Sequence, residues 1–260
     1  MGILNVTPDS FYAGGRHSSL DRVKQHVESM VSEGVDIIDI GGASSRPGAA
    51  QVSPEEELER IIPALECINK AYPELPISVD TYHAFVAREA LGLGARIIND
   101  ITAGSYDSEM LQTIASHRIP YIIMHMQGMP DHMQDRPCYS DVLTEVTAYL
   151  SERIQACQEA GVVDVIIDPG FGFGKSLEHN YRLMAHCSHF QLLDRPMLIG
   201  ISRKSMVQKV VQVGAEDALN GTTALHMYAL QHGAGILRVH DVKEAKETIL
   251  LHQAIRAEYG

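Results

Sequence analysis

Short apolar runs alternate with longer amphipathic stretches along the whole chain. The short runs are rich in Ile, Val and Leu, and they lack the regular apolar–polar alternation of a strand with one solvated face. Such runs are typical of strands that are buried on both faces, as in a parallel sheet. The pattern predicts eight of these strands, over residues 2–6, 35–40, 76–80, 95–100, 120–125, 163–168, 196–200 and 235–239.

The stretches between the predicted strands have the apolar period of amphipathic helices. The clearest start signal is at Ser53, which is suited to be an N-cap, with Pro54 in the first turn. Glu56 follows three positions after Ser53, which is the spacing of a capping box. The predicted helices cover residues 20–33, 82–91, 108–116, 141–160, 177–186 and 216–232, with one that begins at Ser53 and a last one from about residue 242.

The alternation of strand and helix repeats about every 30 residues, with no change of composition that would mark a linker. Alternating strands and helices predict an α/β fold with a parallel sheet, and eight such units predict a closed barrel. We therefore expect residues 1–260 to form a single-domain (β/α)8 TIM barrel. A doubly wound open sheet is the structural alternative.

Composition and net charge limit the kinds of molecule that the protein is expected to bind. The net charge of −12 disfavours a nucleic acid or an anionic membrane surface, because both attract basic proteins. No apolar run approaches the length of a membrane span, and no signal-peptide pattern stands at the N-terminus. The four cysteines are widely spaced and form no CxxC pair, which is typical of reduced thiols. We expect a cytoplasmic protein.

Polar residues stand at the end of most predicted strands, where the catalytic residues of a TIM barrel lie. A single aspartate there more often caps a helix or bonds to its own loop than contacts a ligand, and Asp39 can be explained in that way. The accumulation of such residues nevertheless favours one shared site. Its candidates are Asn5, the loop of residues 39–46, Asp80, Asn99, Asp100, His125, Asp168, residues 202–205, Arg238 and His240.

Two chemical groups can be distinguished among these candidates. Asp80, Asn99 and Asp168, with apolar neighbours such as Met124, could bind the hydrogen-bond donor edge of a planar heterocycle. A second, cationic group suits a phosphate or diphosphate on a protein that is acidic overall. A salt bridge of Arg238 to Asp241 or Glu244, and a solvated Lys204, are the alternatives. The cationic group is Arg46, Arg203, Lys204, Arg238 and His240.

The loop of residues 169–176 contains three glycines, which would allow a flat ligand to approach the backbone closely. It ends like a phosphate-binding P-loop, but Pro169 occupies the required first glycine position. Nor does it match the dinucleotide fingerprint, because Lys175 stands where the third glycine or alanine belongs. His125 lacks the paired ligands of a zinc site, and the histidines are interpreted as scattered surface residues.

Taken together, these residues resemble the dihydropteroate synthase family, with matching motifs in order over residues 2–241. Members of that family usually carry a further strand or hairpin before the first of these motifs. The matching motifs are NVTPDSF (5–11), GG (41–42) with Ser44, RPG (46–48), SVDT (78–81), NDI (99–101), MHMQG (124–128), DPGFGFGK (168–175), SRKS (202–205) and RVHD (238–241).

The resemblance implies a homodimeric transferase of folate biosynthesis that uses Mg²⁺. It would join 6-hydroxymethyl-7,8-dihydropterin diphosphate to 4-aminobenzoate, release diphosphate, and be a target of sulfonamides. The implied catalytic residues are Asp80, Lys204, Arg238 and His240. The implied binding residues are Asp80, Asn99, Met124, Asp168 and Lys204 for the pterin; Asn5, Arg46, Arg238 and His240 for the diphosphate, with Asn5 also for the metal; and Phe11, Ser45, Pro47, Phe173 and Ser205 for the aminobenzoate.

The chain departs from the family pattern in the second loop, which usually reads GGESTRPG. Ala43 replaces the glutamate, and Ser45 replaces the threonine and so lacks its methyl group. Three other functions remain open from the residues alone. They are a pterin-binding methyltransferase domain, a non-catalytic pterin-binding protein, and a barrel lyase or isomerase that handles phosphate.

Overall fold

The computed structural model describes residues 1–7, 16–43, 52–128 and 137–258. Phe11, Ser45, Arg46 and Pro47 lie outside the described residues. Within these ranges the strands are β1 (Gly2–Asn5), β2 (Ile38–Gly41), β3 (Ile77–Asp80), β4 (Ile97–Asp100), β5 (Tyr121–Met124), β6 (Val165–Asp168), β7 (Met197–Ile199) and β8 (Ala234–Leu237). The helices are α2 (Arg16–Ser32), α3 (Pro54–Ala71), α4 (Ala84–Gly92), α5 (Met110–His117), α6 (Val142–Glu159), α7 (Leu177–Ala185), α8 (Ser205–Val211), α9 (Leu219–Gln231) and α10 (Val242–Ala257), with a 3-10 helix at Cys187–Leu193.

The described strands form one eight-stranded sheet in the order of the sequence, and each pairs in parallel with the next. The sheet closes where Gly2 of β1 forms a parallel bridge with Val239, just beyond β8. Ile3 N donates to Val239 O at 2.9 Å, and Val239 N donates to Met1 O at the same distance. A sequential order with closure excludes the doubly wound sheet, so the prediction of a (β/α)8 barrel is confirmed.

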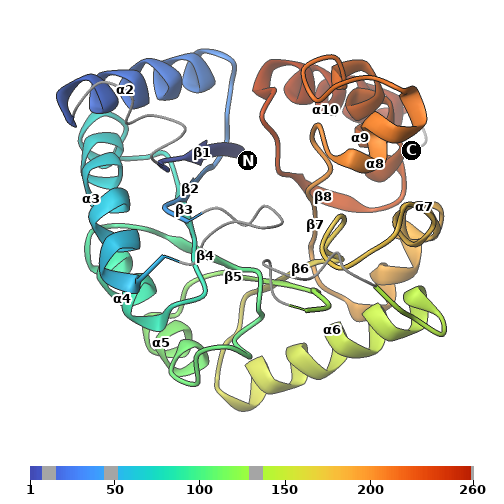
Figure 1. Ribbon diagram of the computed structural model, residues 1–260, viewed down its shortest axis with the longest axis horizontal. Coiled ribbons are helices and arrows are strands. Elements are labelled where there is room, and N and C mark those ends of the chain that lie inside the picture. Colours follow the sequence, from blue (N-terminus) through green and yellow to red (C-terminus); the bar gives the residue numbers. More distant parts are fainter. Residues whose placement is uncertain (8–15, 44–51, 129–136, 259–260) are drawn as a thin grey trace.

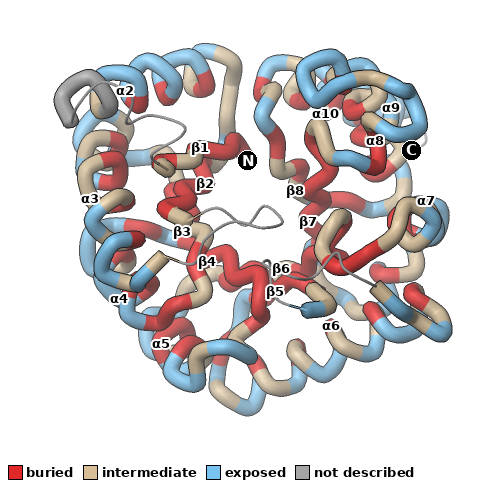
Figure 2. Tube along the Cα trace, in the orientation of Figure 1, coloured by how far each residue is buried: buried red, intermediate tan, exposed pale blue. Residues whose placement is uncertain are grey.

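The helices surround the strands, as Figure 1 shows. Figure 2 shows the burial running along the strands and the inner helix faces, while the outer helix faces are exposed. The main apolar core lies between strands and helices; Leu4, Ile40 and Leu65 are among its fully buried members. A smaller cluster of Met1, Ile97, Ile122 and Leu198 is separate from it. Polar residues occupy the layer of the barrel toward the C-terminal strand ends.

The helix start at Ser53 is confirmed in part. Ser53 Oγ accepts from Glu56 N at 3.2 Å, but the Glu56 carboxylate binds Arg60 instead of returning to the backbone of Ser53. The predictions missed α8 and the 3-10 helix, because seven residues are too few for an apolar period to be recognised. Among the described residues, no helix is both long and apolar enough to cross a membrane.

Candidate active site

The C-terminal strand ends place the predicted polar residues around one opening. Two glycines show how closely they approach each other. A Cβ at Gly41, at the end of β2, would lie 3.4 Å from Asn5 Oδ1 and 3.8 Å from Asp80 Cβ. A Cβ at Gly200, after β7, would lie 3.8 Å from Asp168 Oδ2. Side chains at these two positions would crowd the opening, so the glycines leave room for a ligand beside Asn5, Asp80 and Asp168.

Arg238 is the central cation of this opening. Its Nε donates to Asp39 Oδ2 at 2.6 Å, and its NH2 donates to Asp80 Oδ2 at 2.7 Å. Asn99 Nδ2 donates to the same Asp39 oxygen at 3.1 Å. The alternative that the sequence offered for Arg238 was a salt bridge to Asp241 or Glu244. In the structure, Asp241 is instead bound through both of its oxygens by Arg203.

Burial and neighbouring charges shift the pKa values of this group. Burial raises the pKa of Asp80 to about 7, although Arg238 opposes the rise and Asp39 adds to it. Burial disfavours the charge of Arg238, but Asp39 and Asp80 together hold its pKa above the ordinary value. Arg238 therefore stays charged, while Asp80 is close to its charge transition at neutral pH.

Asp168 and Lys204 form the opposite side of the opening. Asp168 is buried, and its Oδ1 accepts from Gly170 N at 2.7 Å. Burial raises the pKa of Asp168, which the charge of Lys204 opposes. Lys204 Nζ donates to Phe171 O at 2.5 Å and lies 4.5 Å from the centre of the Phe173 ring. The alternative of a solvated Lys204 is therefore wrong.

The remaining described candidates line the rim or the wall of the site. Met124, at the end of β5, is buried and is the register partner of Asp168. His240 is exposed, with Nδ1 3.1 Å from Ser202 Oγ, and Ser202 Oγ also accepts from the backbone N of His240. Ser205 is exposed at the first position of α8. Phe173 is half-buried under Lys204.

Two candidates from the sequence serve the fold instead of the opening. Asp100 accepts from Thr102 N at 2.7 Å, Gly104 N at 2.8 Å and Tyr121 OH at 2.6 Å, so it organises its own loop. Arg203 binds Asp241 and the carbonyls of residues 215 and 216. Both uses depend on partners that strand-end position alone does not reveal.

Asp39 is a functional neighbour that its strand-end position does not single out. A strand-end aspartate is expected to cap a helix or bond to its own loop, but Asp39 is fully buried and binds Arg238 and Asn99 inside the barrel. Its position in the run of residues 35–40 could have signalled this, since a carboxylate within an apolar strand needs a buried partner.

The described residues contain no group of three His, Cys, Asp or Glu side chains able to hold a metal ion. Asn5 is the candidate oxygen ligand at the opening, and Gly41 leaves space beside its Oδ1. Mg²⁺ is commonly bound by one or two protein oxygens together with substrate phosphates and water. The donor set therefore suits a Mg²⁺ ion that arrives with a diphosphate.

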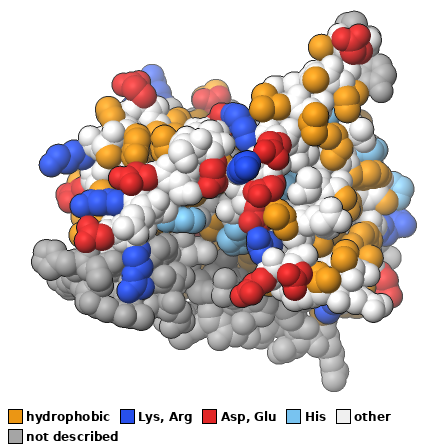
Figure 3. Space-filling view, turned by 90° about the horizontal axis from the view of Figure 1, so that it is seen from above, with side chains coloured by type: hydrophobic (Ala, Val, Ile, Leu, Met, Phe, Trp, Pro, Cys, Tyr) orange, Lys and Arg blue, Asp and Glu red, His pale blue; other side chains and the backbone are white. Residues whose placement is uncertain are grey.

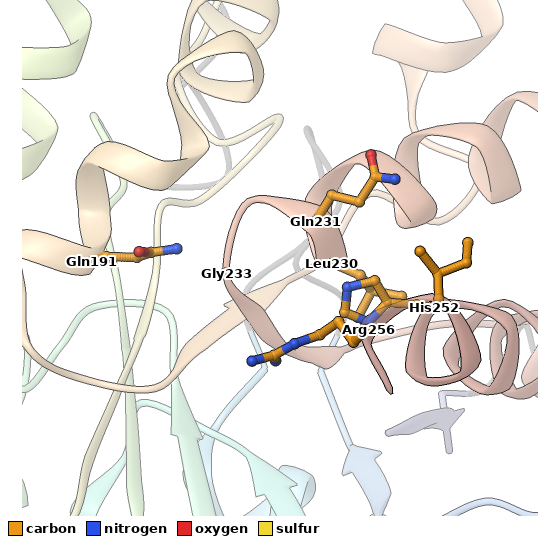
Figure 4. Close-up of a pocket in the computed structure, with 7 residues that line it drawn as sticks. Gln191, Leu230, Gln231, Gly233, His252 and Arg256 are labelled. Atoms are coloured by element: carbon orange, nitrogen blue, oxygen red, sulfur yellow. The ribbon is translucent and has the colours of Figure 1, made fainter. Parts of the chain in front are cut away.

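A separate cavity of about 560 Å³ lies at the other end of the barrel. Gly233, which precedes β8, lies on its wall, and Gln231, His252 and Arg256 also line it (Figure 4). It is remote from the carboxyl strand ends and contains none of the predicted site residues. In Figure 3, acidic and basic side chains are interspersed over the described part of the face shown, so no extended basic patch appears there.

We expect Asp39→Asn to destabilise the protein, because it removes one of the two carboxylates that hold Arg238. The loss should be about 2 kcal/mol, less than for a fully isolated buried charge because Asp80 remains. Urea unfolding measures this change. Asp36→Asn is the matched control: Asp36 is exposed and paired with Lys246, so its loss should stay within about 0.5 kcal/mol. Equal effects of the two substitutions would contradict a stabilising role of the buried pair.

Comparison with known proteins places this site in a family. The family model described as pterin binding enzyme matches residues 1–240. The chain is 48% identical to the dihydropteroate synthase of Escherichia coli strain K12, over 98% of this chain and 90% of that protein. The dihydropteroate synthase of Yersinia pestis, solved with a sulfonamide drug, superimposes with a TM-score of 0.93 at 44% identity, over 99% of this chain and 94% of that one.

A second solved structure covers the same range. The dihydropteroate synthase of Xanthomonas albilineans with 4-aminobenzoic acid superimposes with a TM-score of 0.92 at 42% identity, over 99% of this chain and 92% of that one. Identity at this level over nearly the whole length confirms the resemblance seen in the motifs. The chain belongs to the dihydropteroate synthase family of pterin-binding transferases.

Proposed function

We propose that the protein joins 6-hydroxymethyl-7,8-dihydropterin diphosphate to 4-aminobenzoate, forming 7,8-dihydropteroate and diphosphate in folate biosynthesis. The main support is the arrangement of charges at the C-terminal strand ends. Carboxylates and cations face each other there across a space that two glycines, Gly41 and Gly200, keep free of side chains. The carboxylates suit the N–H groups of a pterin, and the cations suit a diphosphate. Relatives solved with 4-aminobenzoic acid and with a sulfonamide support the arylamine as second substrate.

Asp168 is suited to bind the pterin edge. One of its oxygens accepts from Gly170 N, which fixes the carboxylate orientation and leaves the second oxygen for the ligand. Asn99 is oriented by its bond to Asp39 and can add a further amide contact. Met124 and the stem of Lys204 supply apolar surface for a flat ring.

Arg238 and His240 are suited to stabilise the leaving diphosphate. The family resemblance adds Arg46, which lies outside the described residues. Arg238 keeps its charge at all relevant pH values, so it can offset the negative charge that develops on the leaving oxygen. Mg²⁺, held by Asn5 and the diphosphate, would supply further charge neutralisation when bound. Asp80 can stabilise positive charge on the pterin methylene as the carbon–oxygen bond breaks.

The arylamine then forms the new bond. The diphosphate has by then departed with the electron pair of the broken carbon–oxygen bond. The lone pair of the neutral arylamine nitrogen attacks the cationic pterin methylene carbon, and the nitrogen loses a proton. The reaction needs no protein nucleophile. Phe173 and Ser205 border the space for the arylamine. The family resemblance also implies Phe11, Ser45 and Pro47, which lie outside the described residues. The four widely spaced cysteines support a cytoplasmic location. The family resemblance supports a homodimer.

Diphosphate release from the pterin substrate with Mg²⁺, measured with and without 4-aminobenzoate, tests this function. We expect release to require the arylamine and the product to have the mass of dihydropteroate. Pterin binding without turnover would instead support a non-catalytic pterin-binding protein. Methyl transfer from a methylated pterin would support the methyltransferase alternative.

We expect Asp168→Asn to abolish tight pterin binding. The neutral amide cannot offer the ligand a charge-assisted hydrogen-bond acceptor in place of the free carboxylate oxygen, so affinity should fall at least about 100-fold. Calorimetry with a pterin ligand measures the change. Asp164→Asn, an exposed position just before the same strand, is the control and should bind normally. Near-normal affinity of Asp168→Asn would remove this residue from the pterin site.

We expect the KM for the pterin diphosphate to rise with pH because Lys204 loses its charge. Burial lowers the pKa of Lys204 to about 8, so the ammonium form predominates at pH 7 and is the minor form at pH 9. The KM should rise by up to about tenfold between these values, following the charged fraction. Lys204→Arg stays charged and should lose this dependence, whereas Lys209→Arg, exposed on α8, should retain it. If the KM of Lys204→Arg rises equally with pH, the dependence belongs to the titration of another group.

A further inference from the structure

Lys175 is a buried lysine that the proposed reaction does not use. Only 4% of its surface is exposed. Its Nζ lies 2.8 Å from Gly170 O, 3.0 Å from Phe173 O and 3.3 Å from His125 O. It is also 2.9 Å from Nδ1 of His125. The lysine at the end of the P-loop-like sequence thus turns inward and binds its own loop and the end of β5.

A buried ammonium group is unfavourable unless its protons are well bonded. The partners of the Lys175 amino group among the described residues are carbonyl oxygens and one ring nitrogen, and none of them is a carboxylate. Burial lowers the pKa of His125 to about 3, and the charge of Lys175 adds to this effect. His125 is therefore neutral, its Nδ1 accepts from Lys175, and the expectation of a surface histidine is wrong here.

The glycines of the loop allow this arrangement. Gly170 and Gly174 have φ values of 71° and 61°, in the left-handed region. A Cβ at Gly170 would lie 1.9 Å from His125 O, and one at Gly174 would lie 2.3 Å from Gln127 O. The sequence predicted that these glycines allow a ligand to approach the loop closely. In the structure, the backbone after β5, at His125 and Gln127, makes this close approach. The loop of residues 169–176 packs against the backbone after β5, and Lys175 forms hydrogen bonds to both segments.

The same loop forms one wall of the opening. Phe173 N donates to Gly170 O at 3.1 Å, and Lys175 binds the carbonyls of both residues, so the turn that carries the Phe173 ring is fixed at each end. Lys204 rests on this turn, through Phe171 O and over the Phe173 ring. The place of the ring therefore depends on the bonds of Lys175.

We propose that Lys175 is a positioning residue for the arylamine subsite: its buried amino group clasps residues 170–173 to the end of β5 and so holds the Phe173 ring under Lys204. The proposal rests on the proposed function, because Phe173 is assigned there to the arylamine. Lys175 touches no substrate in this scheme. It acts through the loop, and Asp168, which stands on β6 itself, depends on it less.

Lys175→Met tests the proposal by steady-state kinetics. The variant removes the N–H donors and keeps an unbranched apolar stem. We expect the KM for 4-aminobenzoate to rise at least about tenfold while pterin affinity, measured by calorimetry, stays within about threefold. Lys70→Met, which removes a charge from an exposed position on α3, is the control and should leave both values unchanged.

A purely electrostatic role would give the opposite pattern. The charge of Lys175 helps Asp168 to stay ionised, so its loss through that route would weaken pterin binding first. A selective loss of pterin affinity with an unchanged KM for 4-aminobenzoate would overturn the proposal. Equal losses for both substrates would also overturn it.

A fluorescence measurement separates this proposal from the proposed function, since it needs no substrate. The chain contains no tryptophan, so Phe173→Trp introduces a single reporter at the ring position. Adding Lys175→Met to this background should shift the emission to the red and increase quenching by iodide, because the ring leaves its place under Lys204. Unchanged emission and quenching would overturn the proposal even if the enzyme is active. A red shift of the emission in a protein without synthase activity would support the positioning role of Lys175 and contradict only the proposed reaction.

Circular dichroism decides whether Lys175→Met is folded. If it is not, Lys175→Gln, which retains N–H donors on a shorter stem, is measured in the same two assays. A selective rise in the KM for 4-aminobenzoate together with greater iodide quenching supports the proposal. The absence of either change overturns it.

Discussion

The structure of the site depends on one partly buried charge, the guanidinium of Arg238. The inside of a small barrel must be filled by side chains, and a cation placed there is stable only if carboxylates bind it. Asp39 from β2 and Asp80 from β3 supply them, and Asn99 from β4 binds Asp39 in turn. These bonds connect the end of β8, which closes the barrel, with β2, β3 and β4.

This arrangement also provides the chemistry. A guanidinium held by two carboxylates is oriented before any substrate arrives, so little reorganisation is needed when negative charge develops on a leaving group. Asp80 shares that guanidinium and has its pKa raised to about 7, mainly by burial. Stability and reactivity therefore rest on the same contacts, and the glycines at positions 41 and 200 keep the space above them open.

The loop after β6 is built on a similar principle at smaller scale. Burial lowers the pKa of its lysine, Lys175, to about 7. The amino group bonds to carbonyl oxygens instead of carboxylates, so it holds backbone in place. Lys204 is the cation that faces the opening, although both lysines belong to motifs of the same family resemblance. The two lysines, each followed by a serine, thus have different uses, and the direction of each side chain decides which.

The sequence by itself determined the eight alternating units and the strand-end positions of Asp80, Asn99 and Asp168, because apolar periodicity is local and parallel strands end on one side. It also identified the family through motifs in order. Only the tertiary structure decided which charges meet: Arg238 binds Asp39 across 199 positions of the chain, while its near neighbour Asp241 binds Arg203. Ion pairing and burial depend on distance in space, which no local pattern of residues encodes.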